Sequence, residues 1–141
     1  MATVQRFEDL VIWKLARELS REVYGFTTQQ PFVQDHPLKN QIRASSGSVM
    51  DNIAEGFERG SRKEFIQFLT IAKGPAGETR SQLYRSCDLQ YLTQEEFEAT
   101  KNKCLTLSKM LYSFIEQLKK SEISGIRYKV KKSELPYGSS E

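Results

Sequence analysis

The chain has 141 residues, the length of one domain, and its 28% charged and 38% hydrophobic residues are ordinary for a soluble fold. The longest apolar run near the start, residues 10–13, is far shorter than the ~20 residues of a membrane span. The first ten residues also lack the charged-then-apolar order of a signal peptide. We therefore expect a cytoplasmic protein without membrane contact.

The net charge of +3 is unevenly distributed along the chain. Residues 119–132 contain six Lys or Arg residues and one Glu, a charge of +5 that leaves −2 for the rest. Residues 122–141 are also poor in apolar side chains, so we expect a basic, disordered C-terminal tail after one domain at residues 1–121. If the chain binds nucleic acid, this tail is the first candidate.

The histidine and cysteine content argues against a metal site. Structural zinc sites usually need four Cys or His ligands, and this chain has only His36, Cys87 and Cys104. We expect His36 on a solvated loop and two reduced cysteines in a helical core. The sequence therefore predicts no metal and no cofactor.

The first two elements are helices. The first runs from about residue 7 to 26, where apolar residues recur at alternating intervals of four and three. These residues are Ile12, Ala16, Leu19, Val23 and Phe26. The second helix runs from about residue 37 to 58, because Pro37 suits a first helical turn and Gly60 suits a helix end.

Two further helices each begin with a capping box, in which a Ser or Thr side chain accepts from the amide three residues on. Ser61 with Glu64 begins the third helix. Thr93 with Glu96 begins the fourth, which continues to about residue 121. Pro75 lies inside the third helix and lacks an N–H, so we expect a kink there.

The sequence predicts an all-α protein, because it has four helices with short connections. No segment alternates apolar and polar residues over a convincing length, as a strand would. The predicted architecture is an up-down-up-down antiparallel four-helix bundle. In this arrangement Cys87 lies close to the turn between the third and fourth helices, and Cys104 lies far from it. The two are then more than ~10 Å apart along the axis, too far for a disulfide.

The stretch from residue 45 to 65 mixes small and acidic residues and has several interpretations. It lacks the pattern of a phosphate-binding loop, and the sequence around Ser45, Ser46 and Ser48 lacks the strand-turn-helix elbow of a nucleophilic serine. Asp51 and Glu55 share a helix face and could act as paired carboxylates, but we favour a solvated acidic face. The sequence thus predicts no catalytic residue and no enzyme.

A packing role explains the small residues better. Residues 44–48, which include Gly47, are all small, and a glycine inside a helix costs about 1 kcal/mol relative to alanine. We expect this helix to bring its backbone close to a neighbour, with polar side chains bonded across the contact. The candidates for this structural polar network are Arg43, Asn52, Glu55, Glu78 and Arg80.

Several apolar residues lie off the helical seams, which indicates assembly. A four-helix bundle has one interior, so a second apolar face should be buried against a neighbour unless a wider core absorbs it. The candidate oligomer-interface residues are Leu10, Trp13, Ile66, Ile71, Tyr112 and Ile115, and Met110 lies off the seam as well.

Three sequence segments resemble a known family. They are FEDLVIWKLARELSREVY at residues 7–24, IRASSGSVMDNIAEGFERGSRKEFIQFLTIAKG at residues 42–74 and AGETRSQLY at residues 76–84. They are similar to the four-helix-bundle proteins encoded in intervening sequences of bacterial 23S ribosomal RNA genes, over about residues 7–120. Pro75 departs from the pattern, in which a helix-compatible residue is usual.

This resemblance implies a left-handed bundle that assembles as a ring-shaped homopentamer, and it implies no established enzymatic activity. The chain is also similar to accessory proteins of diversity-generating retroelements, which are basic pentamers that bind nucleic acid and a reverse transcriptase. The body of this chain is not basic.

Two functions remain open. The first is a non-enzymatic protein associated with RNA or DNA through basic side chains. The candidates are Arg59, Arg62, Lys63, Lys119, Lys120, Arg127, Lys129, Lys131 and Lys132. The second is a structural scaffold or adaptor that binds a protein partner, with a tail that folds on contact.

Overall fold

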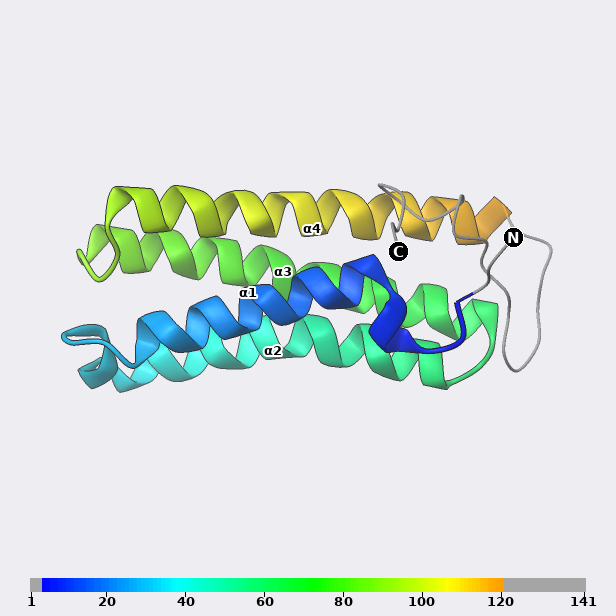
Figure 1. Ribbon diagram of the computed structural model, residues 1–141, viewed down its shortest axis with the longest axis horizontal. Coiled ribbons are helices and arrows are strands. Elements are labelled where there is room, and N and C mark those ends of the chain that lie inside the picture. Colours follow the sequence, from blue (N-terminus) through cyan, green and yellow to red (C-terminus); the bar gives the residue numbers. More distant parts are fainter. Residues whose placement is uncertain (1–3, 121–141) are drawn as a thin grey trace.

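A computed structural model describes residues 4–120, which form four long helices and two short 3-10 turns, with no strand in that range. The helices are α1 (Val11–Thr27), α2 (His36–Glu58), α3 (Arg62–Asp88) and α4 (Gln94–Lys120). They run alternately up and down along one long axis (Figure 1). The prediction of an all-α four-helix fold is confirmed.

The start of the first helix differs from the prediction. A 3-10 turn, η1 (Phe7–Asp9), comes first, and Leu10 is extended with φ −74° and ψ 131° before α1 begins. Helical spacing therefore does not apply to Leu10, and its side chain is fully buried in the core with Val4. The prediction that Leu10 is a surplus surface residue was wrong for this reason.

The helix ends follow the signals in the sequence. Asp35 caps α2, with its Oδ1 accepting from the Leu38 amide at 3.2 Å. Ser61 caps α3 by accepting from the Glu64 amide at 3.1 Å. Thr93 and Glu96 form both bonds of a capping box at the start of α4, at 2.9 and 3.1 Å. Gly60, with φ 85°, makes the left-handed turn that separates α2 from α3.

Pro75 does not interrupt α3, which continues as one helix from Arg62 to Asp88. The hydroxyl of Thr79 donates to the Pro75 carbonyl at 2.9 Å, within the helix.

The core lies between the four helices and includes edge-to-face aromatic contacts. Phe65 is 5.8 Å from Phe57 and 5.5 Å from Phe114, measured between ring centroids.

The end of the bundle at which α3 turns into α4 is tied to the start of α2. The Tyr91 hydroxyl donates to Asp35 Oδ2 at 2.8 Å, and the Tyr91 ring stacks on Phe32 at 4.7 Å. The hydrogen bond to Asp35 raises the pKa of Tyr91, because it stabilises the protonated phenol beside a carboxylate. Asp35 thus holds two connections together with one side chain.

Candidate functional site

The opposite end of the bundle brings together the predicted basic residues of the described chain. Here α2 ends, α3 begins and α4 ends (Figure 1), and we call this the tail end. Arg62 Nη1 donates to the carbonyl of Leu118 at 2.9 Å, which fixes the start of α3 to the last turn of α4. The basic residues at this end are Arg59, Arg62, Lys63, Lys119 and Lys120. The other four candidates, Arg127, Lys129, Lys131 and Lys132, lie outside the described residues.

Acidic neighbours offset part of this positive charge. Arg59 is paired with Glu55 at 3.1 Å and with Glu64 at 3.3 Å, and the hydrogen bond that its guanidinium donates to Glu55 raises the pKa of Arg59. Lys119 is 3.4 Å from Glu116. These pairs are exposed, so each contributes little to stability and can be replaced by a phosphate contact.

Arg62 has a structural role that the sequence did not indicate. Its contact with Leu118 satisfies a carbonyl in the last turn of α4, where helical partners are lacking. Its Nε is buried without a hydrogen-bond partner among the described residues. Lys63, by contrast, is exposed at the next position. Of this adjacent pair, Lys63 is the side chain that can bind a phosphate without loosening the bundle.

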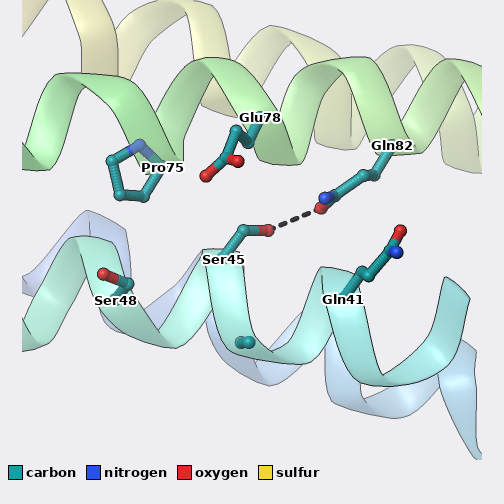
Figure 2. A pocket seen from close by; sticks show the side chains of 7 residues that line it. Gln41, Ser45, Ser48, Pro75, Glu78 and Gln82 are labelled. Atoms are coloured by element: carbon teal, nitrogen blue, oxygen red, sulfur yellow. Dashed lines mark hydrogen bonds between the residues drawn. The ribbon is translucent and has the colours of Figure 1, made fainter. Parts of the chain in front are cut away.

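A second feature is a hollow of about 540 Å³ between α2 and α3, shown in Figure 2. Its floor is polar: Ser45 Oγ donates to Gln82 Oε1 at 2.6 Å and lies 2.8 Å from Thr79 Oγ1. Glu78 from α3 and Ser48 from α2 project into the space beside this bond. The residues that line the hollow are Gln41, Ala44, Ser45, Ser48, Pro75, Glu78 and Gln82.

The polar contact between α2 and α3 therefore exists, but its members are not the predicted ones. Asn52 donates to the carbonyl and hydroxyl of Ser48 at 2.8 and 3.0 Å, within its own helix. Glu55 pairs with Arg59, again within the helix and its cap.

The remaining predicted network members lie elsewhere on the bundle. Arg43 turns toward α1, where its Nε donates to Thr27 Oγ1 at 2.7 Å and its guanidinium lies 3.8 Å from the Tyr24 ring centroid. Glu78 is exposed in the hollow, and Arg80 is half-buried on α3. Ser45, Thr79 and Gln82 could have been found only by pairing the facing positions of α2 and α3.

The close approach of the two helices occurs at Gly56 rather than at Gly47. A Cβ on Gly56 would lie 2.6 Å from Phe68 Cβ and 3.0 Å from Phe65 Cδ1. Among the described residues, a Cβ on Gly47 would meet no atom of another helix within 4 Å. The prediction that this helix carries a glycine for close packing holds, but the glycine is Gly56 and not Gly47.

The predicted interface residues separate into three groups. Ile71 and Tyr112 are 53% and 57% exposed, and Trp13 and Ile66 are half-buried. Leu10 and Ile115 are 0% and 4% exposed within one chain, so they offer no surface to a second one. Ile115 is buried in the same part of α4 as Met110, Leu111, Phe114 and Leu118.

Within residues 4–120, no group of three or more His, Cys, Asp or Glu side chains gathers as a metal ligand set. In the same range no helix is both long enough and apolar enough to cross a membrane. Cys87 and Cys104 are both free thiols, the first half-buried and the second buried.

A sequence model of the family described as "23S rRNA-intervening sequence protein" matches residues 8–113. Among solved structures, the chain is similar to a protein of unknown function from the S23 ribosomal protein family of Bacteroides thetaiotaomicron VPI-5482. The two are 28% identical with a TM-score of 0.69, over 75% of this chain and 99% of the other. No curated protein matches. The family match spans most of the four-helix bundle, so the chain belongs to the 23S rRNA-intervening sequence protein family.

Proposed function

We propose that the protein is a non-enzymatic, nucleic-acid-associated protein that binds phosphate backbones with its tail end and C-terminal tail. One observation carries the proposal: the Arg62 contact with Leu118 places the basic turn between α2 and α3 beside the point where the tail leaves α4. Lys63 and Lys120 are exposed there, and the following residues of the chain add Arg127, Lys129, Lys131 and Lys132. Two sequence regions about 60 residues apart thus contribute to one basic surface.

The proposed binding is electrostatic and not specific for a base sequence. Each Lys or Arg that neutralises a phosphate releases counterions, so affinity should fall steeply with salt. Four tail contacts to duplex DNA would contribute about −3.6 to the slope of log K against log salt. Tyr128 and Tyr137 offer aromatic rings that can stack on bases of a single strand.

The test measures the affinity of the full chain for a structured RNA and a DNA duplex between low and physiological salt. The variant replaces Arg127, Lys129, Lys131 and Lys132 with Gln. Affinity at low salt should fall by more than tenfold, and the salt slope should become less steep by about 3 to 4. An unchanged slope would refute the role of the tail.

A matched control removes the same amount of charge from the parts of the bundle away from the tail end. Arg17, Arg21, Arg85 and Lys109 are all exposed there, so four Gln substitutions should leave the fold intact. If this control weakened binding as much as the tail variant, net charge rather than the tail end would account for the binding.

We also propose that the functional unit is a ring-shaped homopentamer. Tyr112 remains exposed on one chain and Trp13 and Ile66 are half-buried, so a ring would bury apolar area of these side chains against a neighbour and gather five tails. Five copies of 16.3 kDa would have a mass of about 82 kDa by light scattering. A mass that stays at the 16.3 kDa of a single chain across micromolar protein concentrations would refute assembly.

Tyr112 also supports a second candidate function, a scaffold or adaptor for a protein partner. Tyr112 lies under the Lys73 ammonium at 5.4 Å, which gives this face an aromatic and cationic character. Purification with a stoichiometric protein and without nucleic acid would favour this function over the first.

A further inference from the structure

The outward face of α3 carries two hollows in succession. The first is the polar hollow between α2 and α3, which includes Pro75 and Glu78. The second, of about 610 Å³, lies one turn nearer the tail end and includes Phe68 and Ile71. Ile71 and Pro75 are four residues apart on the same helix face, so the hollows adjoin. We call the two together the α3 groove.

The α3 groove is apolar at one end and acidic at the other. Ile71 is 53% exposed, and Phe68 is half-buried with the Arg59 guanidinium 5.0 Å from its ring centroid. Beyond them, Glu78 is exposed on α3, and Asp51 is exposed on the face of α2 that continues from Ser48.

Two arginines bound this acidic stretch, and each already has a partner. Arg59 is paired with Glu55 and Glu64, and Arg85 donates to Gln41 Oε1 at 3.0 Å. Lys73 points toward Tyr112 on the α4 side. The α3 groove is therefore suited to an extended segment that has apolar side chains near its first residues and basic ones near its last.

The chain contains such a segment. Residues 126–132 read IRYKVKK, in which Ile126, Tyr128 and Val130 alternate with basic residues. In an extended backbone, alternate side chains point to the same side, so Ile126 and Tyr128 lie together, and Lys131 and Lys132 follow each other at the end of the segment. We propose that residues 126–132 dock in the α3 groove of their own chain, with Ile126 and Tyr128 on Phe68 and Ile71, and with the lysines at positions 129, 131 and 132 toward Asp51 and Glu78.

The length of chain after α4 fits this path. Lys120 lies at the tail end, where α3 begins. Ile71 is nine residues into α3, roughly 14 Å along its axis, and the width of one helix adds ~10 Å. Residue 126 is six residues beyond Lys120 and reaches up to ~20 Å when extended, which covers the resulting ~17 Å. Glu78 is ~24 Å along α3, within the reach of residues 129–132.

Docking has a consequence that rests on the function proposed above. The basic side chains that face Asp51 and Glu78 are the same ones that would contact phosphates. The α3 groove therefore competes with nucleic acid for the tail. Substitutions that weaken docking of the tail in the groove should increase the affinity of the protein for nucleic acid.

The first test locates the tail in the full chain. A zero-length carbodiimide crosslinker joins amines to carboxylates in direct contact, and mass spectrometry identifies the linked peptides. Equal amounts of nitrogen-15-labelled and unlabelled chains are refolded together before crosslinking. Links from Lys129, Lys131 or Lys132 to Glu78 or Asp51, within one isotope, are expected. Links that pair labelled with unlabelled chains would overturn docking within one chain, and so would no link to the groove.

The second test compares trypsin cleavage after residues 127–132 in full-length variants. Asp51→Asn with Glu78→Gln weakens the acidic part, and Ile71→Ser weakens the apolar part. Either change should speed cleavage about fivefold, because the bound tail must leave the groove before it is cut. Asp88→Asn with Glu95→Gln removes the same charge at the other end and should leave the rate unchanged. Equal rates in all variants would overturn the proposal.

A third measurement separates docking from nucleic-acid binding. Asp51→Asn with Glu78→Gln should bind a generic structured RNA about fivefold more tightly than the charge-matched control. Equal affinity would overturn the competition. If the full chain bound no RNA at all, the function proposed above would fail, whereas the crosslinking and cleavage results would still decide whether the tail docks.

Discussion

Gly56 allows α2 and α3 to approach each other, and Gly56→Ala should reverse this. The new Cβ would lie 2.6 Å from Phe68 Cβ, where ordinary contacts begin near 3.4 Å. Phe68 Cβ is attached directly to the backbone of α3, so relief requires the two helices to separate by nearly an ångström. Overpacking of this kind lowers the free energy of unfolding by ~1–3 kcal/mol, and the better helix propensity of alanine offsets up to ~1 kcal/mol of this loss. We expect a net loss of ~1–2 kcal/mol.

Gly47→Ala is the matched control, because the same Cβ is added to the same helix without a clash. It should stabilise the protein by ~0.5–1 kcal/mol through helix propensity alone. Urea denaturation followed by circular dichroism measures both values, and thermal midpoints should shift in opposite directions by about 4 °C per kcal/mol. If Gly56→Ala were as stable as Gly47→Ala, the close approach of α2 and α3 would be refuted.

Three further predictions concern single side chains. Ser45→Ala removes the bond between α2 and α3 and should lower the free energy of unfolding in urea by ~1–3 kcal/mol; a loss below ~0.5 would contradict its buried role. Arg62→Ala should lower the free energy of unfolding by ~1–2 kcal/mol and Lys63→Ala by less than ~0.5 kcal/mol. Equal losses would show that the bond from Arg62 to Leu118 does not stabilise the end of α4. Burial raises the pKa of the Cys104 thiol to about 12, so iodoacetamide at pH 8 should modify Cys87 in the folded protein and Cys104 only on unfolding. The unfolded thiol ionises near ~8.5, so the contribution of Cys104 to stability is full below that pH and declines up to about pH 12.

Most of the fold could be predicted from the sequence because its signals are local. The apolar spacing of α1 and the capping residues Ser61 and Thr93 need only a few neighbouring positions to be recognised. The departures arose where the backbone leaves the helix and where residues off the seam are buried too. Leu10 is extended before α1, and Ile115 is buried beside the seam residues Phe114 and Leu118, and neither fact is encoded in helical spacing.

The candidate site was harder to predict because it depends on which helix faces meet. Asn52 has the chemistry for a bond across the bundle, but its neighbour Ser48 is nearer. Ser45 and Thr79 form the cross-helix contact because their positions on α2 and α3 face each other close to Pro75. The basic residues of the turn after α2 were recognised as charges, but the use of Arg62 as a structural donor depends on where α4 ends.

Each end of the bundle is closed by a side chain whose partner lies 56 positions away, Arg62 with Leu118 and Tyr91 with Asp35. Contacts of such sequence separation can form only after the helices have docked, so they belong to the late part of folding. Interactions that are absent from the transition state slow unfolding without speeding folding. The two closures therefore govern how long a folded molecule lasts once formed, and substitutions there should change its lifetime more than its rate of assembly from the unfolded chain.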